Sequence, residues 1–109
     1  MNSYDGGSRE AEATTGTLIA HRVLVNHGPL RALCLIRSGE QYGIYRFFDG
    51  DSAVTLVEVL SQCREEVDAL GSFLARTGNE ADLGRKSLTS DWSKSLAETI
   101  PERRTRRHE

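Results

Sequence analysis

The sequence predicts an α+β fold: a four-stranded antiparallel meander with one helix packed on one face, a short second helix near the C-terminus, and disordered termini. Runs of β-branched, aromatic and aliphatic residues in the first half are separated by turns that contain glycine, which is typical of antiparallel strands. The hydrophobic period then changes to that of a helix. A chain of 109 residues is the size of one domain, so these elements are expected to share a core.

The turns between the predicted strands are marked by glycine and proline. An Asn-His-Gly-Pro turn at 26–29 ends the first predicted strand, because Gly28 and Pro29 both stop a strand. A Ser-Gly-Glu turn at 38–40 and an Asp-Gly turn at 49–50 supply two hairpins, the first with a two-residue loop at 38–39 or 39–40. The four strands comprise residues 17–25, 30–37, 42–48 and 53–60.

The residues after the meander predict a helix over 61–78. Ser61 is a suitable N-cap, and Gly78 is a suitable terminator. One apolar stripe recurs at the spacing of a helix face. Its members are Cys63, Val67, Leu70 and Leu74.

Polarity divides the chain into three parts. Residues 1–16 contain no aliphatic residue larger than alanine and are expected to be disordered. Residues 17–78 form the α+β domain, and residues 79–109 form a polar extension that ends in a basic tail at 101–109.

Within this extension a short helix is predicted at about 91–99, with Ser90 as its cap. Trp92, Leu96 and Ile100 share one side of it, at the spacing of a helix that anchors in a partner's groove. The alternative is that this side folds back over the sheet or its open edge.

Strand alternation assigns the side chains of the meander to two faces. The first face is expected to accept the 61–78 helix; it carries Ile19, His21, Val23, Val25, Ala32, Cys34, Ile36, Tyr45, Phe47, Val54, Leu56 and Leu60. The second face carries Leu18, Arg22, Leu24, Arg31, Leu33, Leu35, Arg37, Tyr42, Ile44, Arg46, Phe48, Val57 and Val59. In one register Arg31 lies opposite Arg46, a like-charge pair that is destabilising unless something neutralises it.

Three interpretations of the second, arginine-bearing face are open. It is a solvated surface whose arginines pair with Asp49 or Asp51; or it is an interface with a partner protein or a second copy, because its apolar residues exceed what a monomer usually exposes; or it binds an anion or an RNA backbone. The balanced charge of residues 17–60 disfavours nucleic acid. The candidate binding residues are Arg22, Arg31, Arg37, Arg46, Tyr42 and Phe48.

His21 and Cys34 are predicted to lie opposite each other on the first face, and Cys63 lies on the helix expected to cover it. This arrangement suits a thiolate–imidazole dyad or an incomplete metal site. The simpler interpretation is a buried thiol beside a locally hydrogen-bonded histidine. We therefore predict no catalytic residue, metal or cofactor.

Composition and the pattern of apolar residues argue against several other classes of protein. The net charge of −2 argues mildly against a dedicated nucleic-acid binder. No apolar run approaches the ~18 residues that span a bilayer, and the N-terminus lacks the basic and apolar regions of a signal peptide. The two cysteines are then expected to be free thiols in a cytoplasmic protein that does not contact a membrane.

Residues 30–77 carry a motif seen elsewhere: Leu30-Arg31, then Ser38-Gly-Glu-Gln-Tyr42-Gly-Ile-Tyr-Arg46-Phe-Phe48, a third strand and a helix. This pattern resembles the distal half of RelE/HigB-type toxins, the small ribonucleases of bacterial toxin–antitoxin pairs. The resemblance implies that Arg31 and Arg46 match the sheet arginines of that family and that Arg64 matches its basic position beyond the third strand.

We therefore predict a small, non-catalytic, cytoplasmic regulatory or adaptor protein. It is expected to bind a protein partner or a second copy through its arginine-bearing face, its open strand edges or its C-terminal helix. The alternative is a RelE/HigB-like toxin ribonuclease.

Overall fold

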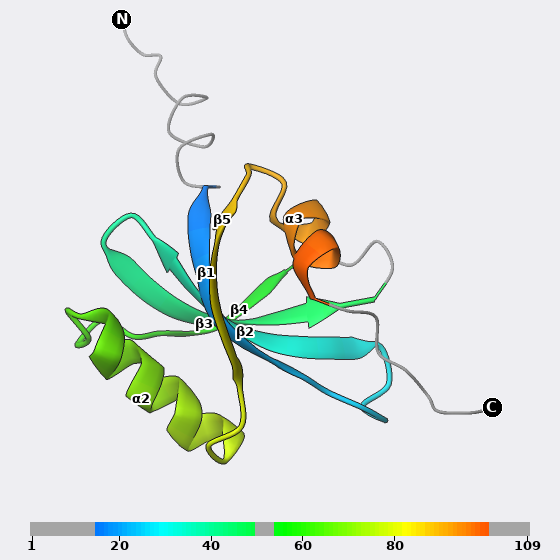
Figure 1. Cartoon of the computed structure of the whole chain (residues 1–109), viewed down its shortest axis with the longest axis horizontal. Coiled ribbons are helices and arrows are strands. Elements are labelled where there is room, and N and C mark those ends of the chain that lie inside the picture. The colour runs from blue at the N-terminus through cyan, green and yellow to red at the C-terminus, as the bar shows by residue number, and fades with distance from the viewer. Residues whose placement is uncertain (1–14, 50–53, 101–109) are drawn as a thin grey trace, which may run out of the picture.

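The computed structural model describes residues 15–49 and 54–100. They form an antiparallel sheet of five strands in the order β4-β3-β2-β1-β5, together with two helices (Figure 1). The elements are β1 (Gly16–Val23), β2 (Leu30–Ser38), β3 (Gln41–Phe48), β4 (Thr55–Val59), α2 (Glu66–Thr77), β5 (Asp82–Leu88) and α3 (Trp92–Thr99). The α+β class is confirmed. Residues 1–14 of the predicted disordered segment, Gly50 of the predicted 49–50 turn and the basic tail at 101–109 lie outside the described residues. Gly16, the last residue of the predicted disordered segment, begins β1.

The prediction of four strands was wrong, because β5 adds a fifth that pairs with β1. Six of its seven residues are exposed, and only Leu88 is buried. A strand with so little apolar alternation is held mainly by its backbone hydrogen bonds to β1, so its sequence gives no periodic signal.

Both helices begin later than predicted. α2 starts at Glu66 because the chain first makes a tight turn, in which the Cys63 amide donates to the Leu60 carbonyl. Gly78 ends α2 as predicted, in the left-handed conformation at φ 70°. α3 is capped by Asp91, whose side chain accepts a hydrogen bond from the Lys94 amide, and not by Ser90.

The β2–β3 hairpin has the second of the two predicted loops. Ser38 pairs with Gln41, which leaves Gly39 and Glu40 as the turn. Gly39 adopts φ 65°, a conformation that glycine reaches without strain.

Three irregularities change the faces of the sheet. One is Val57, an extra residue in β4 relative to β3, which puts Val57 and Val59 on opposite faces and not on one face as predicted. Ile19 is an extra residue in β1 relative to β2, and Arg31 is an extra residue in β2 relative to β3. An extra residue reverses the alternation from that point. As a result Leu18 lies on one face while Ile19 and Ala20 both lie on the other.

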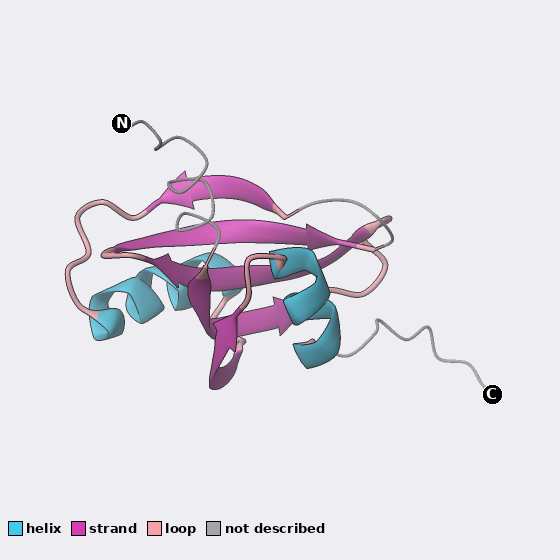
Figure 2. Ribbon diagram, turned by 90° about the horizontal axis from the view of Figure 1, so that it is seen from above, coloured by secondary structure: helices cyan, strands magenta, loops and turns pink. Residues whose placement is uncertain are grey.

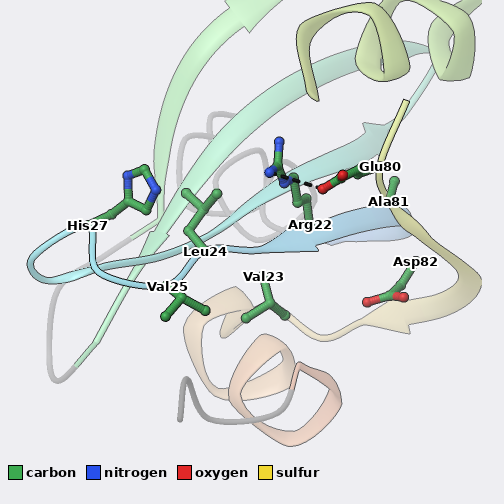
Figure 3. A pocket seen from close by; sticks show the side chains of 8 residues that line it. All are labelled: Arg22, Val23, Leu24, Val25, His27, Glu80, Ala81 and Asp82. Atoms are coloured by element: carbon green, nitrogen blue, oxygen red, sulfur yellow. Dashed lines mark ion pairs between the residues drawn. The ribbon is translucent and has the colours of Figure 1, made fainter. Parts of the chain in front are cut away.

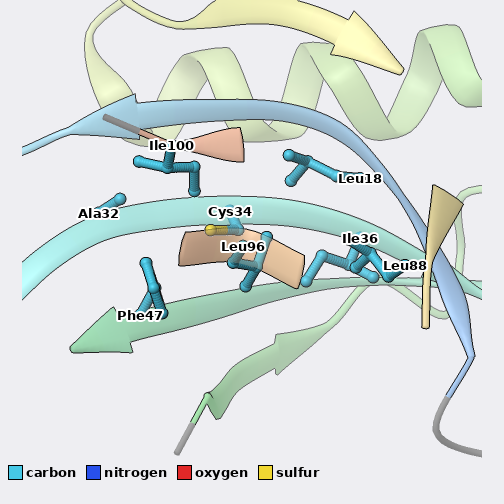
Figure 4. Packing of buried hydrophobic residues seen from close by; sticks show 8 residues of the cluster. All are labelled: Leu18, Ala32, Cys34, Ile36, Phe47, Leu88, Leu96 and Ile100. Atoms are coloured by element: carbon cyan, nitrogen blue, oxygen red, sulfur yellow. The ribbon is translucent and has the colours of Figure 1, made fainter. Parts of the chain in front are cut away.

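Each face of the sheet carries a hydrophobic cluster covered by a different helix (Figure 2). The α3 face has Leu96 and Ile100 packed on strands β1 to β3, as Figure 4 shows. Its buried members are Leu18, Ala32, Cys34, Ile36, Phe47, Leu88, Leu96 and Ile100. The α2 face has Ile19, Ala20, Leu35, Tyr42, Ile44, Leu60, Ala69 and Phe73.

The prediction of which face α2 covers was therefore wrong. The 61–78 helix was expected over Cys34 and Phe47, but α2 packs on the face of Leu35 and Ile44. Both faces of the sheet carry a large apolar surface, which is stable only when another element buries it. α2 buries one face and α3 buries the other.

Candidate interaction surface

The four arginines of the meander do not form one surface. Arg31 is the extra residue in β2, so its side chain lies on the α3 face. Arg22 lies on the α2 face, where it reaches the end of α2, and Arg46 pairs with Leu33 of the same face. The predicted Arg31–Arg46 opposition does not occur, because the turn at 39–40 sets a register in which Arg46 lies opposite Leu33. The bulge at Arg31 also turns its side chain to the other face.

Arg31 is buried and structural. Only 7% of it is exposed, and its guanidinium donates a 2.6 Å hydrogen bond to the Ile100 carbonyl, at the end of α3. Its charge lies 5.0 Å from the centre of the Phe47 ring and 3.8 Å from the Asp49 carboxylate. These contacts satisfy a buried cation, which would otherwise be costly.

Arg22 makes the equivalent contact on the opposite face. Its guanidinium donates a 2.7 Å hydrogen bond to the Thr77 carbonyl, in the last turn of α2, and pairs with Glu80 at 3.1 Å. A cation there also interacts favourably with the negative end of the helix dipole.

The remaining candidates on the predicted arginine-bearing face are dispersed. Arg46 is exposed, whereas Tyr42 is only 5% exposed and belongs to the α2 cluster. Phe48 is half-buried beside Leu30 at the other end of β3. Arg37 donates from Nε to the Gly39 carbonyl at 2.9 Å. These residues therefore lie at separate places on the sheet. Binding through the whole set stays a prediction.

The apolar side of α3 is packed on the sheet. Leu96 and Ile100 have no exposed surface, and the Trp92 ring meets Tyr45 edge-to-face at a centroid distance of 5.1 Å. The fold-back interpretation of this helix therefore describes the structure. Partner binding through Trp92, Leu96 and Ile100 stays a prediction that requires α3 to leave the sheet.

His21 and Cys34 do lie opposite each other, as predicted. Cys63 lies by the other cluster, beside Ser72 at 3.8 Å, so the three residues do not converge. Burial raises the pKa of the Cys34 thiol well above its usual range, so this thiol stays protonated. Burial also lowers the pKa of His21, an effect partly opposed by Asp82 at 3.5 Å. A protonated, fully buried thiol is a poor nucleophile, which favours the structural interpretation of this pair.

A hollow of about 450 Å³ lies between the end of β1 and the segment that leads into β5 (Figure 3). Arg22 and Glu80 face each other across it, while Val23 and Val25 point away towards α3. Arg22 pairs with Glu80, and Asp82 pairs with His21. The charges in this hollow therefore neutralise one another and give little attraction for a charged ligand.

β4 is an outer strand of the sheet, and within residues 15–49 and 54–100 no strand pairs with its outer edge. Leu56 and Val59 are 47% and 43% exposed. A second hollow, of about 410 Å³, lies between this edge and α2. It is lined by Ile44, Glu58, Leu60, Ser72, Ala75 and Arg76. Glu58 and Arg76 form an ion pair across it, so the hollow has apolar walls and a neutralised rim.

The opposite edge, at β5, differs in chemistry. Arg85 and Lys86 lie on it, and Arg85 pairs with Glu66 of α2. Charged side chains on an edge strand discourage pairing with another chain. The β4 edge was named only generally from the sequence, and its α2 wall was missed because Ser72 and Arg76 look like an ordinary solvated helix face.

Within residues 15–49 and 54–100, no group of three or more histidine, cysteine, aspartate or glutamate residues is placed to hold a metal ion. Among the same residues, no helix has the length and hydrophobicity that crossing a membrane requires. Comparisons of the chain with protein-family models, curated proteins and solved structures give no match.

Proposed function

We propose that this protein is a small, non-catalytic, cytoplasmic adaptor that holds an extended segment of a partner protein along the free edge of β4. The observation that carries the proposal is the combination of a strand edge that no described residue pairs with and a hollow beside it. Such an arrangement suits strand addition, in which backbone hydrogen bonds supply affinity and pockets for alternate side chains supply specificity.

The geometry of β4 favours an added strand at its C-terminal half. The Leu60 amide donates to the Tyr42 carbonyl at 2.8 Å, so alternation along an antiparallel pair points the amide of Val59 away from β3. That amide is an edge donor for an incoming backbone. The ladder is shifted between the Glu58 and Leu56 pairings, which shortens the regular edge, so side-chain contacts must contribute to binding.

The side chains beside this edge define the chemistry of the partner. An added strand alternates its own side chains between the two faces. On one face they meet the hollow walled by Ile44, Leu60 and Ala75, and on the other they meet Leu56 and Val59. The proposed partner segment is therefore extended and uncharged, with apolar residues on both sides.

Selection from a library of random twelve-residue peptides tests this proposal. We expect the wild-type protein to enrich peptides with apolar residues and without proline. Val59→Pro removes the edge donor without removing a β3–β4 hydrogen bond, so it should abolish the enrichment. Leu83→Lys, at a residue that is 65% exposed on the β5 edge, is the matched control and should leave enrichment unchanged.

Amide shifts in a nuclear magnetic resonance titration then locate the bound peptide. They should be largest in β4 and in the α2 residues that line the hollow. No enrichment, equal enrichment by Val59→Pro, or shifts confined to other elements would overturn the proposal. Dimerisation lost in Val59→Pro would show that the segment held at this edge comes from a second copy.

A further inference from the structure

A third hollow, independent of the β4 edge, lies where the β2–β3 turn meets the segment between β4 and α2. It has a volume of about 400 Å³, within the range typical of small-molecule sites. Its lining residues are Arg37, Glu40, Tyr42, Ser61, Cys63 and Arg64. We refer to it as the Arg37/Arg64 pocket.

The pairing of arginines singles out this pocket. In the described part of the chain, four arginines lie within ion-pair distance of a carboxylate: Arg22, Arg31, Arg76 and Arg85. Three described arginines have no such ion pair: Arg37, Arg46 and Arg64. Two of these three line the same hollow. Two arginines that line one hollow, neither of them in an ion pair, favour an anionic ligand there.

The groups around the two cations suit a phosphate. Arg37 is oriented by the 2.9 Å hydrogen bond from its Nε to the Gly39 carbonyl, which leaves its terminal nitrogens as donors. Guanidinium groups bind phosphate oxygens through paired, charge-assisted hydrogen bonds. The hydroxyls of Ser61 and Tyr42 add neutral donors at the same pocket.

We propose that the Arg37/Arg64 pocket binds the phosphate group of a small phosphate monoester. The hollow is larger than a phosphate alone, so the ester group occupies the remainder. Glu40 also lines the pocket, and its carboxylate weakens binding of an anion. Its presence makes the charge of the pocket adjustable by one substitution.

Cys63 provides a direct measure of occupancy. It lines the pocket and is half-buried, whereas Cys34 is fully buried and serves as an internal reference. We expect O-phosphoserine to slow alkylation of Cys63 by iodoacetamide in the full chain, and inorganic phosphate to do so at higher concentration. Sodium chloride at matched ionic strength should not protect. Each variant is compared with its own rate without ligand.

Substitutions of the two arginines test their roles. Arg37→Gln and Arg64→Gln should each weaken protection about tenfold in ligand concentration, the effect of losing one charge-assisted hydrogen bond. Arg46→Gln removes an equal charge from an unpaired arginine outside the pocket and should change nothing. Glu40→Gln should strengthen protection.

Protection by phosphoserine that each pocket variant weakens about tenfold, and that Arg46→Gln leaves unchanged, supports the site. Protection by inorganic phosphate alone would overturn the assignment to a monoester. No protection by either probe, or equal losses in Arg46→Gln and the pocket variants, would overturn the site itself.

Discussion

Arg22 and Arg31 perform the same task on opposite faces of the sheet, and they differ in how much depends on them. Each comes from one of two neighbouring strands and donates to a carbonyl at the end of the helix that covers its face. Arg22 is partly exposed, with 36% of its side chain accessible, whereas Arg31 has 8%.

The two helices explain this difference. α2 has twelve residues and ends in a left-handed Gly78, where the amides of Gly78 and Asn79 both donate to the Leu74 carbonyl. α3 has eight residues and no glycine, and its cap at Ile100 is extended. A helix this short is marginal without tertiary contacts, so α3 depends on the sheet and on Arg31. α2 therefore forms backbone hydrogen bonds that stabilise its own C-terminus, whereas the C-terminus of α3 is held by Arg31 of the sheet.

The largest effects should come from the centre of each cluster. Phe73→Ala on the α2 face should destabilise the protein by about 3–5 kcal/mol, and Leu96→Ala on the α3 face by about 2–5 kcal/mol, because both leave cavities. Both faces share the same strands, so we expect one cooperative transition in each variant. Circular dichroism and the fluorescence of Trp92, the single tryptophan, should report the same midpoint. A separate early fluorescence transition in Leu96→Ala would show that α3 is an independent unit.

An intermediate effect should distinguish the two arginines. Arg31→Ala should cost about 3 kcal/mol, because it leaves buried groups without their cation. Arg22→Ala should cost about 1 kcal/mol, because its ion pair with Glu80 is solvated. Urea denaturation measures both values, and Arg46→Ala is the exposed control.

The site of the damage should also differ. Arg31→Ala should change Trp92 fluorescence in the native state, since Trp92 is part of α3, and Arg22→Ala should not. Equal costs, or equal changes in fluorescence, would contradict the dependence of α3 on Arg31.

The smallest effect concerns pH on the α3 face. His21 has a pKa lowered from its ordinary value of 6.5, so the folded state binds fewer protons than the unfolded state. The contribution of His21 to the free energy of unfolding should therefore be fully present above about pH 6.5 and decrease as the pH falls below that value. His21→Gln should remove this part of the slope between pH 7 and 5.5 in urea titrations. An unchanged slope would assign it to other groups.

Much of the fold was accessible from the sequence because its strands and helices carry regular signals. The four strands of the meander, the 39–40 turn and the end of α2 at Gly78 follow from alternation, turn chemistry and helix periodicity. β5 was missed because an exposed edge strand needs no apolar pattern. The α3 helix was predicted, and Trp92, Leu96 and Ile100 do share its apolar side.

The candidate surface was harder to predict, for two reasons that the sequence does not encode locally. One extra residue at Arg31 reverses the alternation, and no composition marks a bulge at that place. The sequence also does not show which helix packs on which face, because both faces are apolar. Cys34 and Leu35 are equally buried on opposite faces. Arg64 was noted only through a family resemblance, and its proximity to Arg37 arises from the turn after β4.

The pairing of β1 with β5 has a consequence for synthesis of the chain. The first strand to leave the ribosome keeps one side unpaired until the last strand has emerged, some sixty residues later. A truncated product that stops before Asp82 would lack β5, so residues 18–20 of β1 would lie on an unpaired strand edge. It would also lack α3, so one apolar face of the sheet would be exposed. Nonsense mutations in this stretch should therefore yield aggregates rather than a smaller working protein.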